Sequence, residues 1–321
     1  MVFDPKPYLK ELARGPGGTR DLSREQAATL FAAVLRGEVA DIALGALLVA
    51  YRVKGETADE LAGMMEALSG HVAPMRLPNR RAAPVVLPTY NGSRKLPNLV
   101  PLLALLLARE GVPVLLHGVA QEPQRVGTFE ILRALGHETV ASLDEAEARL
   151  DQQLVAAVPI EVLAPDLARI LDVRLQVGVR NTAHTLAKLL LPQGVASTAA
   201  CRLISVTHPD FQKLMRTLFA GSPANLFLMR GVEGEAVVRL HAPQPIEQIG
   251  LDGKIVTHLM GEGEAEPSLP ARDAIATAAW TKQVLEGSAR APVALARQVA
   301  LIAEHCHAAG AAARPTLKLV K

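Results

Sequence analysis

The sequence predicts an α/β protein: a small N-terminal helical domain, residues 1–78, packed on a larger α/β domain, residues 79–321, with a mainly parallel central sheet. Three observations lead to this prediction. The first seventy or so residues have helical periodicity. From residue 85 onward, short apolar runs alternate with helical segments, as in parallel sheets covered by helices. Half of the residues are hydrophobic and 21% are charged, which suits a packed core.

The N-terminal part contains helices with recognisable starts. Ser23 is followed three residues later by Gln26, and Thr57 is followed in the same way by Glu60. Both pairs have the pattern of a capping box, in which the two residues satisfy each other's free backbone N–H groups. The helix between them is apolar on most faces and is therefore expected to be buried. The predicted helices span residues 24–36, 39–54 and 58–68.

The remaining chain contains five apolar runs short enough to be buried strands. They span residues 85–87, 112–117, 154–158, 202–207 and 225–229. Pro209 suits the first turn of a helix, where its missing N–H costs nothing. The predicted helices of this part span residues 96–110, 126–135, 209–220, 271–286 and 292–309. Residues 74–84, with three prolines and three arginines, form the predicted linker.

The net charge of +2 conceals a segregation of charge along the chain. Residues 174–230 contain seven Lys or Arg and one acid, and residues 76–133 contain eight against three. Residues 138–172 hold eight acids against two basic residues, and residues 233–266 hold seven against two. If folding keeps these segments apart, a basic surface for polyanions results; if folding mixes them, the surface is neutral.

Cys201 and Cys306 are too few for a disulfide framework or a multi-cysteine metal site, which fits a reducing compartment. The N-terminus lacks the basic-then-apolar order of a signal peptide. The longest apolar run, residues 99–108, is about half as long as a membrane span. We therefore expect a cytoplasmic protein that does not interact with membranes.

The segment LPTYNGSRKLPN, residues 87–98, connects a predicted strand to a predicted helix. Such connections often bind phosphate, because the turn and the helix N-terminus present free N–H groups. This turn has one glycine, Gly92, followed closely by Arg94 and Lys95. The two cations either contact a phosphate or form an ordinary solvated pair, which the helix dipole would slightly disfavour. We favour the phosphate contact.

Further cations occur at helical spacing. Arg180, His184 and Lys188 are four residues apart and are expected to share one face of a helix, where they could follow a phosphate backbone or simply face solvent. Lys213 and Arg216 are three apart near the start of the helix at 209–220. The candidate nucleic-acid contacts are Arg94, Lys95, Arg180, Lys188, Arg202, Lys213 and Arg216.

The helical opening, with LSREQA at 22–27 and GALLVAYRVKGETADELAG at 45–63, closely resembles the N-terminal domain of anthranilate phosphoribosyltransferases. The similarity covers most of the chain, including VRLQVGVR at 173–180 and LHAP at 240–243. The resemblance implies a fold of the nucleoside phosphorylase and phosphoribosyltransferase type. It also implies dimerisation through the helical domain, with a helical segment around residues 165–192 packing against that domain.

The catalytic motifs of that family are not kept. TYNGS at 89–93 stands in place of its Gly-Thr-Gly-Gly-Asp diphosphate loop, and Leu116 in place of the lysine of Lys-His-Gly-Asn-Arg. Ala236 and Val237 align with the paired acids that hold magnesium. Without these groups little remains to stabilise the charge of departing pyrophosphate. The resemblance thus argues against the family reaction, and we expect no metal and no cofactor.

Part of the family pocket nevertheless remains. Arg174 matches an arginine that contacts the aromatic acid in the enzymes, and Arg180 matches a second one. His117 and Gly118 lie at the end of a predicted strand, where ligand-facing turns occur in α/β sheets, although a single histidine there is more often a hydrogen-bonded structural residue. The candidate residual pocket for a small anion consists of Asn91, Gly92, Ser93, Asn98, His117, Gly118 and Arg174.

Four motifs are similar to those of a divergent bacterial group with the same fold, the YbiB-type proteins. They are YNGSRK at 90–95, GVRNTAHTLAK at 178–188, SVTHP at 205–209 and EGE at 233–235. The resemblance implies a homodimer that binds DNA and RNA without sequence preference and lacks anthranilate phosphoribosyltransferase activity.

Two hypotheses of different class follow, and a third is kept. The first is a non-enzymatic nucleic-acid-binding homodimer; because aromatic residues make up only 3% of the chain, its binding would rest on phosphate electrostatics rather than base stacking. The second, suggested by Arg174, Arg180 and Asn98, is a phosphoribosyltransferase with a non-anthranilate acceptor, dependent on magnesium and phosphoribosyl pyrophosphate. The third is a scaffold that binds a protein through acidic residues 138–172.

Overall fold

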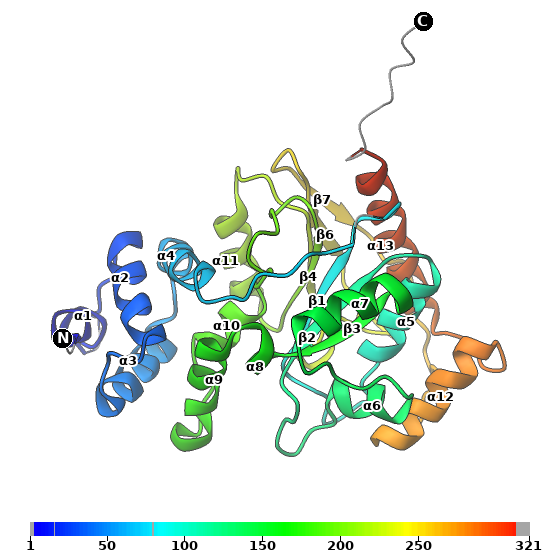
Figure 1. The fold of residues 1–321 in the computed structure, drawn as a ribbon, viewed down its shortest axis with the longest axis horizontal. Helices are drawn as coiled ribbons and strands as arrows, with labels where there is room; N and C mark the ends of the chain where they lie inside the picture. Colours follow the sequence, from blue (N-terminus) through cyan, green and yellow to red (C-terminus); the bar gives the residue numbers. More distant parts are fainter. Residues whose placement is uncertain (1–2, 16, 79, 313–321) are drawn as a thin grey trace, which may run out of the picture.

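The structure, a computed structural model, describes residues 3–15, 17–78 and 80–312. Its N-terminal part is a group of helices at the left of Figure 1. Both predicted capping boxes form: the side chain of Ser23 accepts from the Gln26 N–H, and that of Thr57 accepts from the Glu60 N–H. The helices are α1 (Lys6–Leu12), α2 (Arg24–Leu35), α3 (Asp41–Lys54) and α4 (Ala58–Ser69).

The rest of the chain is built on a seven-stranded sheet with the order β3-β2-β1-β4-β5-β6-β7. The strands are β1 (Val85–Thr89), β2 (Val114–Gly118), β3 (Val155–Pro159), β4 (Cys201–Val206), β5 (Leu226–Arg230), β6 (Ile246–Ile249) and β7 (Ile255–His258). Strands β1 to β5 pair in parallel, whereas β6 and β7 are antiparallel additions at one edge. The prediction of a mainly parallel sheet is therefore confirmed.

Helices cover both faces of the sheet (Figure 1). Successive residues of β1 point to opposite faces: Val86 joins one apolar cluster, and Val85 and Leu87 join the other. On the Val85 side lie α5 (Val100–Arg109), α6 (Thr128–Ala134), α12 (Ala274–Glu286) and α13 (Val293–Ala312). On the Val86 side lie α7 (Leu143–Gln153), α8 (Ile160–Leu163), α9 (Pro165–Val177), α10 (Ala183–Ala187) and α11 (Pro209–Phe219). None of the helices in the described ranges has both the length and the apolar character needed to cross a membrane.

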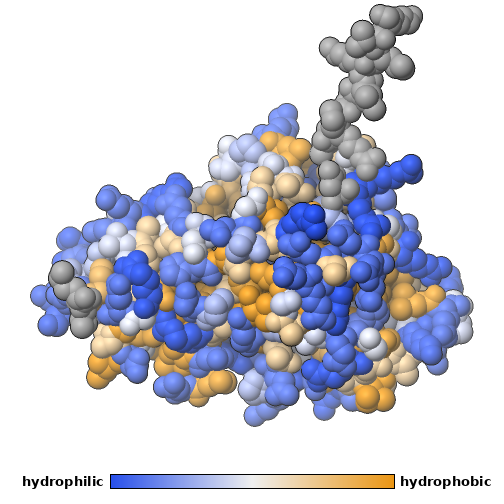
Figure 2. All heavy atoms as spheres, in the orientation of Figure 1, coloured by the Kyte–Doolittle hydropathy of each residue, from blue (hydrophilic) through white to orange (hydrophobic). Residues whose placement is uncertain are grey.

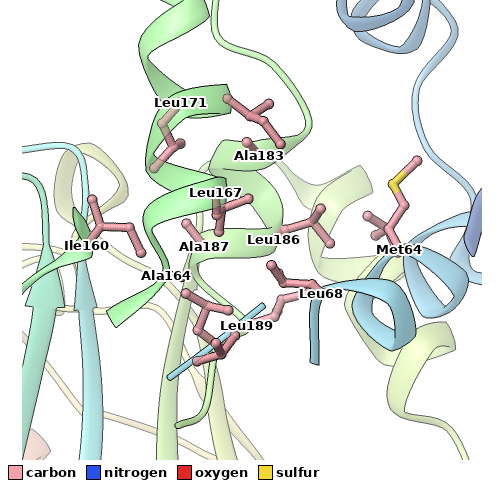
Figure 3. Close-up of a cluster of buried hydrophobic side chains, with 14 of the residues drawn as sticks. Met64, Leu68, Ile160, Ala164, Leu167, Leu171, Ala183, Leu186, Ala187 and Leu189 are labelled. Atoms are coloured by element: carbon pink, nitrogen blue, oxygen red, sulfur yellow. The ribbon is translucent and has the colours of Figure 1, made fainter. Parts of the chain in front are cut away.

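The N-terminal helices share an apolar core with α9, α10 and α11. Met64 and Leu68 of α4 lie near Leu186 and Leu189 of the α10 region (Figure 3), and all four belong to one buried cluster. The guanidinium of Arg169 on α9 adds a polar connection, because its Nη2 donates to two carbonyl oxygens at the end of α2. The two parts of the molecule are thus joined by continuous packing.

The expectation that Arg180, His184 and Lys188 share a helix face is wrong. Helix α9 ends at Val177, where Gly178 adopts a left-handed φ of 79° and caps it. The next helix begins only at Ala183, so Arg180 lies in the connection between the two. Glycine is the residue that most readily takes this conformation, and it terminates helices for that reason.

Candidate anion-binding site at the carboxyl edge of the sheet

Strands β1, β2, β4 and β5 point the same way, so the loops that follow them meet at one edge of the sheet. The chain passes from β1 to β2 and β3 on one side and to β4 and β5 on the other. Ligands of open α/β sheets bind where the strand order reverses in this way. The loop at 90–99, which follows β1, is therefore in the position expected of a binding loop.

Glu235, on the loop after β5, lies against this segment and is only 3% exposed. Its Oε1 accepts the backbone N–H groups of Asn91 at 2.8 Å and Gly92 at 2.7 Å. Burial raises the pKa of Glu235, and the two N–H donors and the nearby charge of Lys188 oppose this effect. A buried carboxylate thus occupies the turn at Asn91 and Gly92.

Glu233 occupies the second half of the same loop. Its Oε1 accepts from the backbone N–H of Lys95 at 2.8 Å and from the Ser93 hydroxyl at 2.9 Å. The N–H groups of Leu96 and Arg94 also donate to this carboxylate, at 3.2 and 3.1 Å. Burial works to raise the pKa of Glu233, but these donors outweigh it, and the pKa lies below its usual range. Glu233 has a φ of 51°, a strained conformation for a non-glycine residue, which these contacts stabilise.

The loop after β1 is therefore an anion-binding loop whose anions belong to the protein. Five of its backbone N–H groups, at positions 91, 92, 94, 95 and 96, donate to Glu233 or Glu235. The side chains of Arg94 and Lys95 are exposed to solvent instead of entering the loop. The sequence identified the loop but not the internal carboxylates that bind its backbone, and contact of Arg94 and Lys95 with a phosphate stays a prediction.

A third internal carboxylate holds the arginines that match the aromatic-acid contacts. Glu122, on the loop after β2, is 8% exposed. Arg174 donates to it through Nη1 at 2.7 Å and Nη2 at 2.5 Å, a bidentate pair. Arg180 donates to the same carboxylate at 3.0 Å and also to the side-chain oxygen of Asn91. Burial lowers the pKa of Arg180, and the charge of Glu122 opposes that effect.

The other residues of the expected small-anion pocket have internal roles. Asn98 donates to the Val126 carbonyl at 3.2 Å. His117 is fully buried and bonds to the Tyr90 hydroxyl at 2.7 Å. Burial lowers the pKa of His117 to about 3, so the ring is neutral at physiological pH. Gly118 is required sterically, because a Cβ there would lie 1.9 Å from a β1 carbonyl oxygen.

The seven candidate nucleic-acid contacts fall into different environments. Arg94, Lys95 and Lys213 are exposed and form no ion pair with any residue that the structure describes. Arg216 pairs with Glu247, its Nε lying 2.7 Å from Oε2, and its side chain is 47% exposed. Arg202 is only 3% exposed and does not lie on the surface.

Lys188 is half-buried, and its ammonium is directed at internal acceptors. Its Nζ donates to the carbonyls of Gly234 at 3.0 Å and Ser205 at 3.1 Å. Burial lowers the pKa of Lys188 to about 8, while the charge of Glu235 acts in the opposite direction. His184, beside it, has a pKa lowered to about 3 by burial and by Arg180. His184 is therefore neutral at physiological pH, whereas Lys188 remains charged and lines a cleft with Arg52 and Arg180.

The donor set does not fit magnesium. The positions that align with the family's paired acids, Ala236 and Val237, are buried and apolar. The carboxylate of Glu233 already accepts three backbone N–H groups, and that of Glu235 accepts two. Within residues 3–15, 17–78 and 80–312, no group of three or more His, Cys, Asp or Glu side chains is arranged to hold a metal ion.

Comparisons with known proteins identify relatives of this chain. The profile of the glycosyl transferase family, helical bundle domain, matches residues 6–71. An uncharacterized protein of Escherichia coli, YbiB, is 38% identical over 299 residues, which cover 93% of each chain. The anthranilate phosphoribosyltransferase of Thermus thermophilus is 27% identical over 284 residues, 85% of this chain and 82% of that one.

Solved structures show the same fold. The crystal structure of anthranilate phosphoribosyltransferase from Thermus thermophilus matches with a TM-score of 0.72 and 26% identity, over 96% of this chain and 90% of that one. The Saccharomyces cerevisiae enzyme in complex with PRPP and Mg matches in fold, with a TM-score of 0.70 and 16% identity over 96% and 94%. The chain therefore belongs to the anthranilate phosphoribosyltransferase-like family that includes YbiB.

Proposed function

We propose that this protein is a homodimer that binds DNA and RNA without sequence preference, on a phosphoribosyltransferase-like fold that no longer performs the transfer reaction. One observation carries the part of the proposal that concerns the transfer reaction. The loop N–H groups and the arginines that would receive two substrate anions are occupied by Glu122, Glu233 and Glu235. An incoming diphosphate would have to take these donors from the glutamates, which would leave negatively charged carboxylates without hydrogen-bond partners.

The exposed cations near this edge support binding of a polyanion. Arg94 and Lys95 project from the loop after β1, and Lys213 lies on α11. Arg52, at the end of α3, and Arg180 line a small cleft of about 120 Å³ beside α10 and α11. Arg52 was not among the residues singled out from the sequence, because it lies outside the basic segments. Such scattered cations suit phosphate contacts without base recognition.

Replacing Lys95 and Lys213 together by glutamate is expected to weaken binding to all oligonucleotides about tenfold or more. The slope of log affinity against log salt should become shallower by about two, because two phosphate contacts are lost. Fluorescence anisotropy with single-stranded and duplex oligonucleotides of unrelated sequence measures both quantities. Lys254→Glu with Lys282→Glu is the matched control, since it changes the net charge equally at exposed positions, beside β7 and on α12.

The fold, together with Arg174, Arg180 and Asn98, favours the alternative of a phosphoribosyltransferase with a non-anthranilate acceptor. Calorimetry with phosphoribosyl pyrophosphate and magnesium separates the two functions. Saturable heat together with release of pyrophosphate would contradict our proposal. Absence of heat, combined with salt-dependent binding of every oligonucleotide, supports it. A strong preference for one sequence would also contradict it.

The dimer part of the proposal rests on an exposed apolar stripe. Ile42, Val49 and Val53 are 88%, 37% and 81% exposed and lie seven and four residues apart, on one face of α3. Leu175 and Val179, near the end of α9, are 63% and 42% exposed. Figure 2 shows apolar surface at the lower left, where Figure 1 places α3. Exposed apolar patches on soluble proteins commonly mark interfaces.

Introducing a charge into this stripe with Val53→Glu is expected to give a monomer, because an unpaired carboxylate would be buried between two copies. Light scattering after size exclusion measures the change, from twice the chain mass of 34.1 kDa to the mass of one chain. Val256→Glu is the control, since Val256 is 50% exposed on the edge strand β7. A dimer that persists in Val53→Glu would place the interface elsewhere.

A further inference from the structure

A second cavity lies away from the edge described above. It has a volume of about 630 Å³ and lies between α4, the segment at 189–197 and the end of α11. Arg202 contributes to its lining from the second residue of β4, near the amino end of that strand. The loop at 90–96 and its carboxylates lie at the carboxyl ends of the strands. The two sites are therefore at opposite ends of the sheet.

Arg202 is buried with few partners. The residue as a whole is 3% exposed. Its Nη1 donates to the Leu189 carbonyl at 3.2 Å, and its guanidinium carbon lies 5.0 Å from the centre of the Phe219 ring. Its Nε has no hydrogen-bond partner among the described residues. Burial lowers the pKa of Arg202 to about 10, which leaves the group charged at physiological pH.

The charge of Arg202 is not compensated by an acid. No carboxylate of the described ranges lies within ion-pair distance of it. Glu66, which also lines the cavity, pairs with Arg24 and is 51% exposed. A buried cation with one carbonyl and one aromatic ring as partners is costly to maintain, because its lost hydration is not replaced. An anion that enters the cavity would supply this guanidinium with the hydrogen-bond acceptor and negative charge that it lacks.

The walls of the cavity are mainly apolar, with Leu68, Leu190, Val195 and Leu218 among them. Figure 3 shows that Leu68 projects from α4 toward the α10 region. Cavities of about 300–1,000 Å³ with apolar walls and a few polar groups are typical of small-molecule sites. The chemistry of this cavity suits an apolar body that carries one negative charge. A nucleotide or sugar diphosphate has more charges than one guanidinium can neutralise.

We propose that this cavity binds a carboxylic acid with an apolar body, whose carboxylate pairs with Arg202. The planar guanidinium offers two parallel N–H donors, a geometry that matches a carboxylate. The apolar body lies between α4 and the end of α11, so the ligand contacts both the N-terminal helices and the α/β part. This site is independent of the nucleic-acid proposal.

Decanoate is a suitable probe for the full-length protein, with decanol as its uncharged analogue. Calorimetry is expected to show saturable binding of decanoate that is at least tenfold tighter than binding of decanol. Arg202→Met should remove this preference, and Arg36→Met, which removes an exposed guanidinium, should keep it. Equal affinity of the parent for decanoate and decanol, or an unchanged preference in Arg202→Met, would overturn the proposal.

A second variant keeps the test informative if Arg202→Met does not fold. Ala62, half-buried on α4, lines the cavity, and Ala62→Trp should fill it while leaving the guanidinium in place. The variant is expected to lose binding of decanoate and the rise in melting temperature that the ligand causes. Ala141→Trp adds the same side chain at an exposed position outside the cavity and should retain both. Undiminished binding in Ala62→Trp would place the ligand elsewhere and overturn the proposal.

Discussion

Replacing Glu235 with leucine is expected to lower the free energy of unfolding by about 3–5 kcal/mol. The carboxylate is 3% exposed and accepts the N–H groups of Asn91 and Gly92. Leucine would leave both donors without a partner and would remove a negative charge that favours the protonated form of half-buried Lys188. Each of these losses is costly in the interior, because water cannot replace the missing acceptor.

Urea unfolding at neutral pH and fixed protein concentration measures this effect. Glu235→Gln keeps an acceptor for the N–H groups but loses the charge, so its cost should lie between those of the parent and the leucine variant. Glu266→Leu, at an exposed position, should change the stability by about 0.5 kcal/mol or less. A loss below about 1 kcal/mol in Glu235→Leu would mean that the loop does not depend on its internal carboxylate.

Acid is expected to destabilise the protein from about pH 6.5 downward, in part through His117. The pKa of this histidine is lowered by burial from 6.5 to about 3. Between these values the unfolded chain binds a proton that the folded chain does not, so stability falls as the pH falls. The contribution of His117 approaches about 1.4 kcal/mol per pH unit. His184, whose pKa is lowered to about 3 by burial and by Arg180 and Arg174, acts in the same direction.

His117→Gln isolates this contribution, since glutamine can bond to Tyr90 but does not titrate. Between about pH 6.5 and about pH 5 the variant should lose about 1.5 kcal/mol less stability than the parent. Urea unfolding at several pH values gives both curves. His208→Gln, at the exposed start of α11, is the matched control and should follow the parent. Parallel curves for the parent and His117→Gln would show that the folded protein accepts a proton on this ring.

Features that depend on neighbouring residues could be predicted from the sequence. The capping boxes at Ser23 and Thr57 form because both partners lie within one turn. The buried strands are continuous apolar runs, a pattern that can be recognised without knowing which residues pack against them. The wrong prediction that Arg180 shares a helix face with His184 and Lys188 also has a local cause. Gly178 ends a helix there, and the four-residue spacing of cations outweighed that signal in the prediction.

The central feature of the site could not be predicted from local patterns. Glu233 and Glu235 contact residues about 140 positions earlier, and only the pairing of strands brings the two loops together. The sequence offered a partial signal in the motif EGE and in Glu122, one of three acids within a basic segment. The burial of Arg202 could not be predicted either, because the sequence does not show whether an arginine on a strand points into the core or outward.

The three internal carboxylates also bear on how such a protein could change over evolutionary time. Each one stabilises the native state by satisfying donors on another segment of the chain, so its removal weakens the protein before any new capacity is gained. Opening a substrate pocket at this edge would require coordinated changes in the loops after β1, β2 and β5, because residues in contact do not act independently. A single substitution among the three glutamates therefore costs stability without opening a pocket at this edge of the sheet.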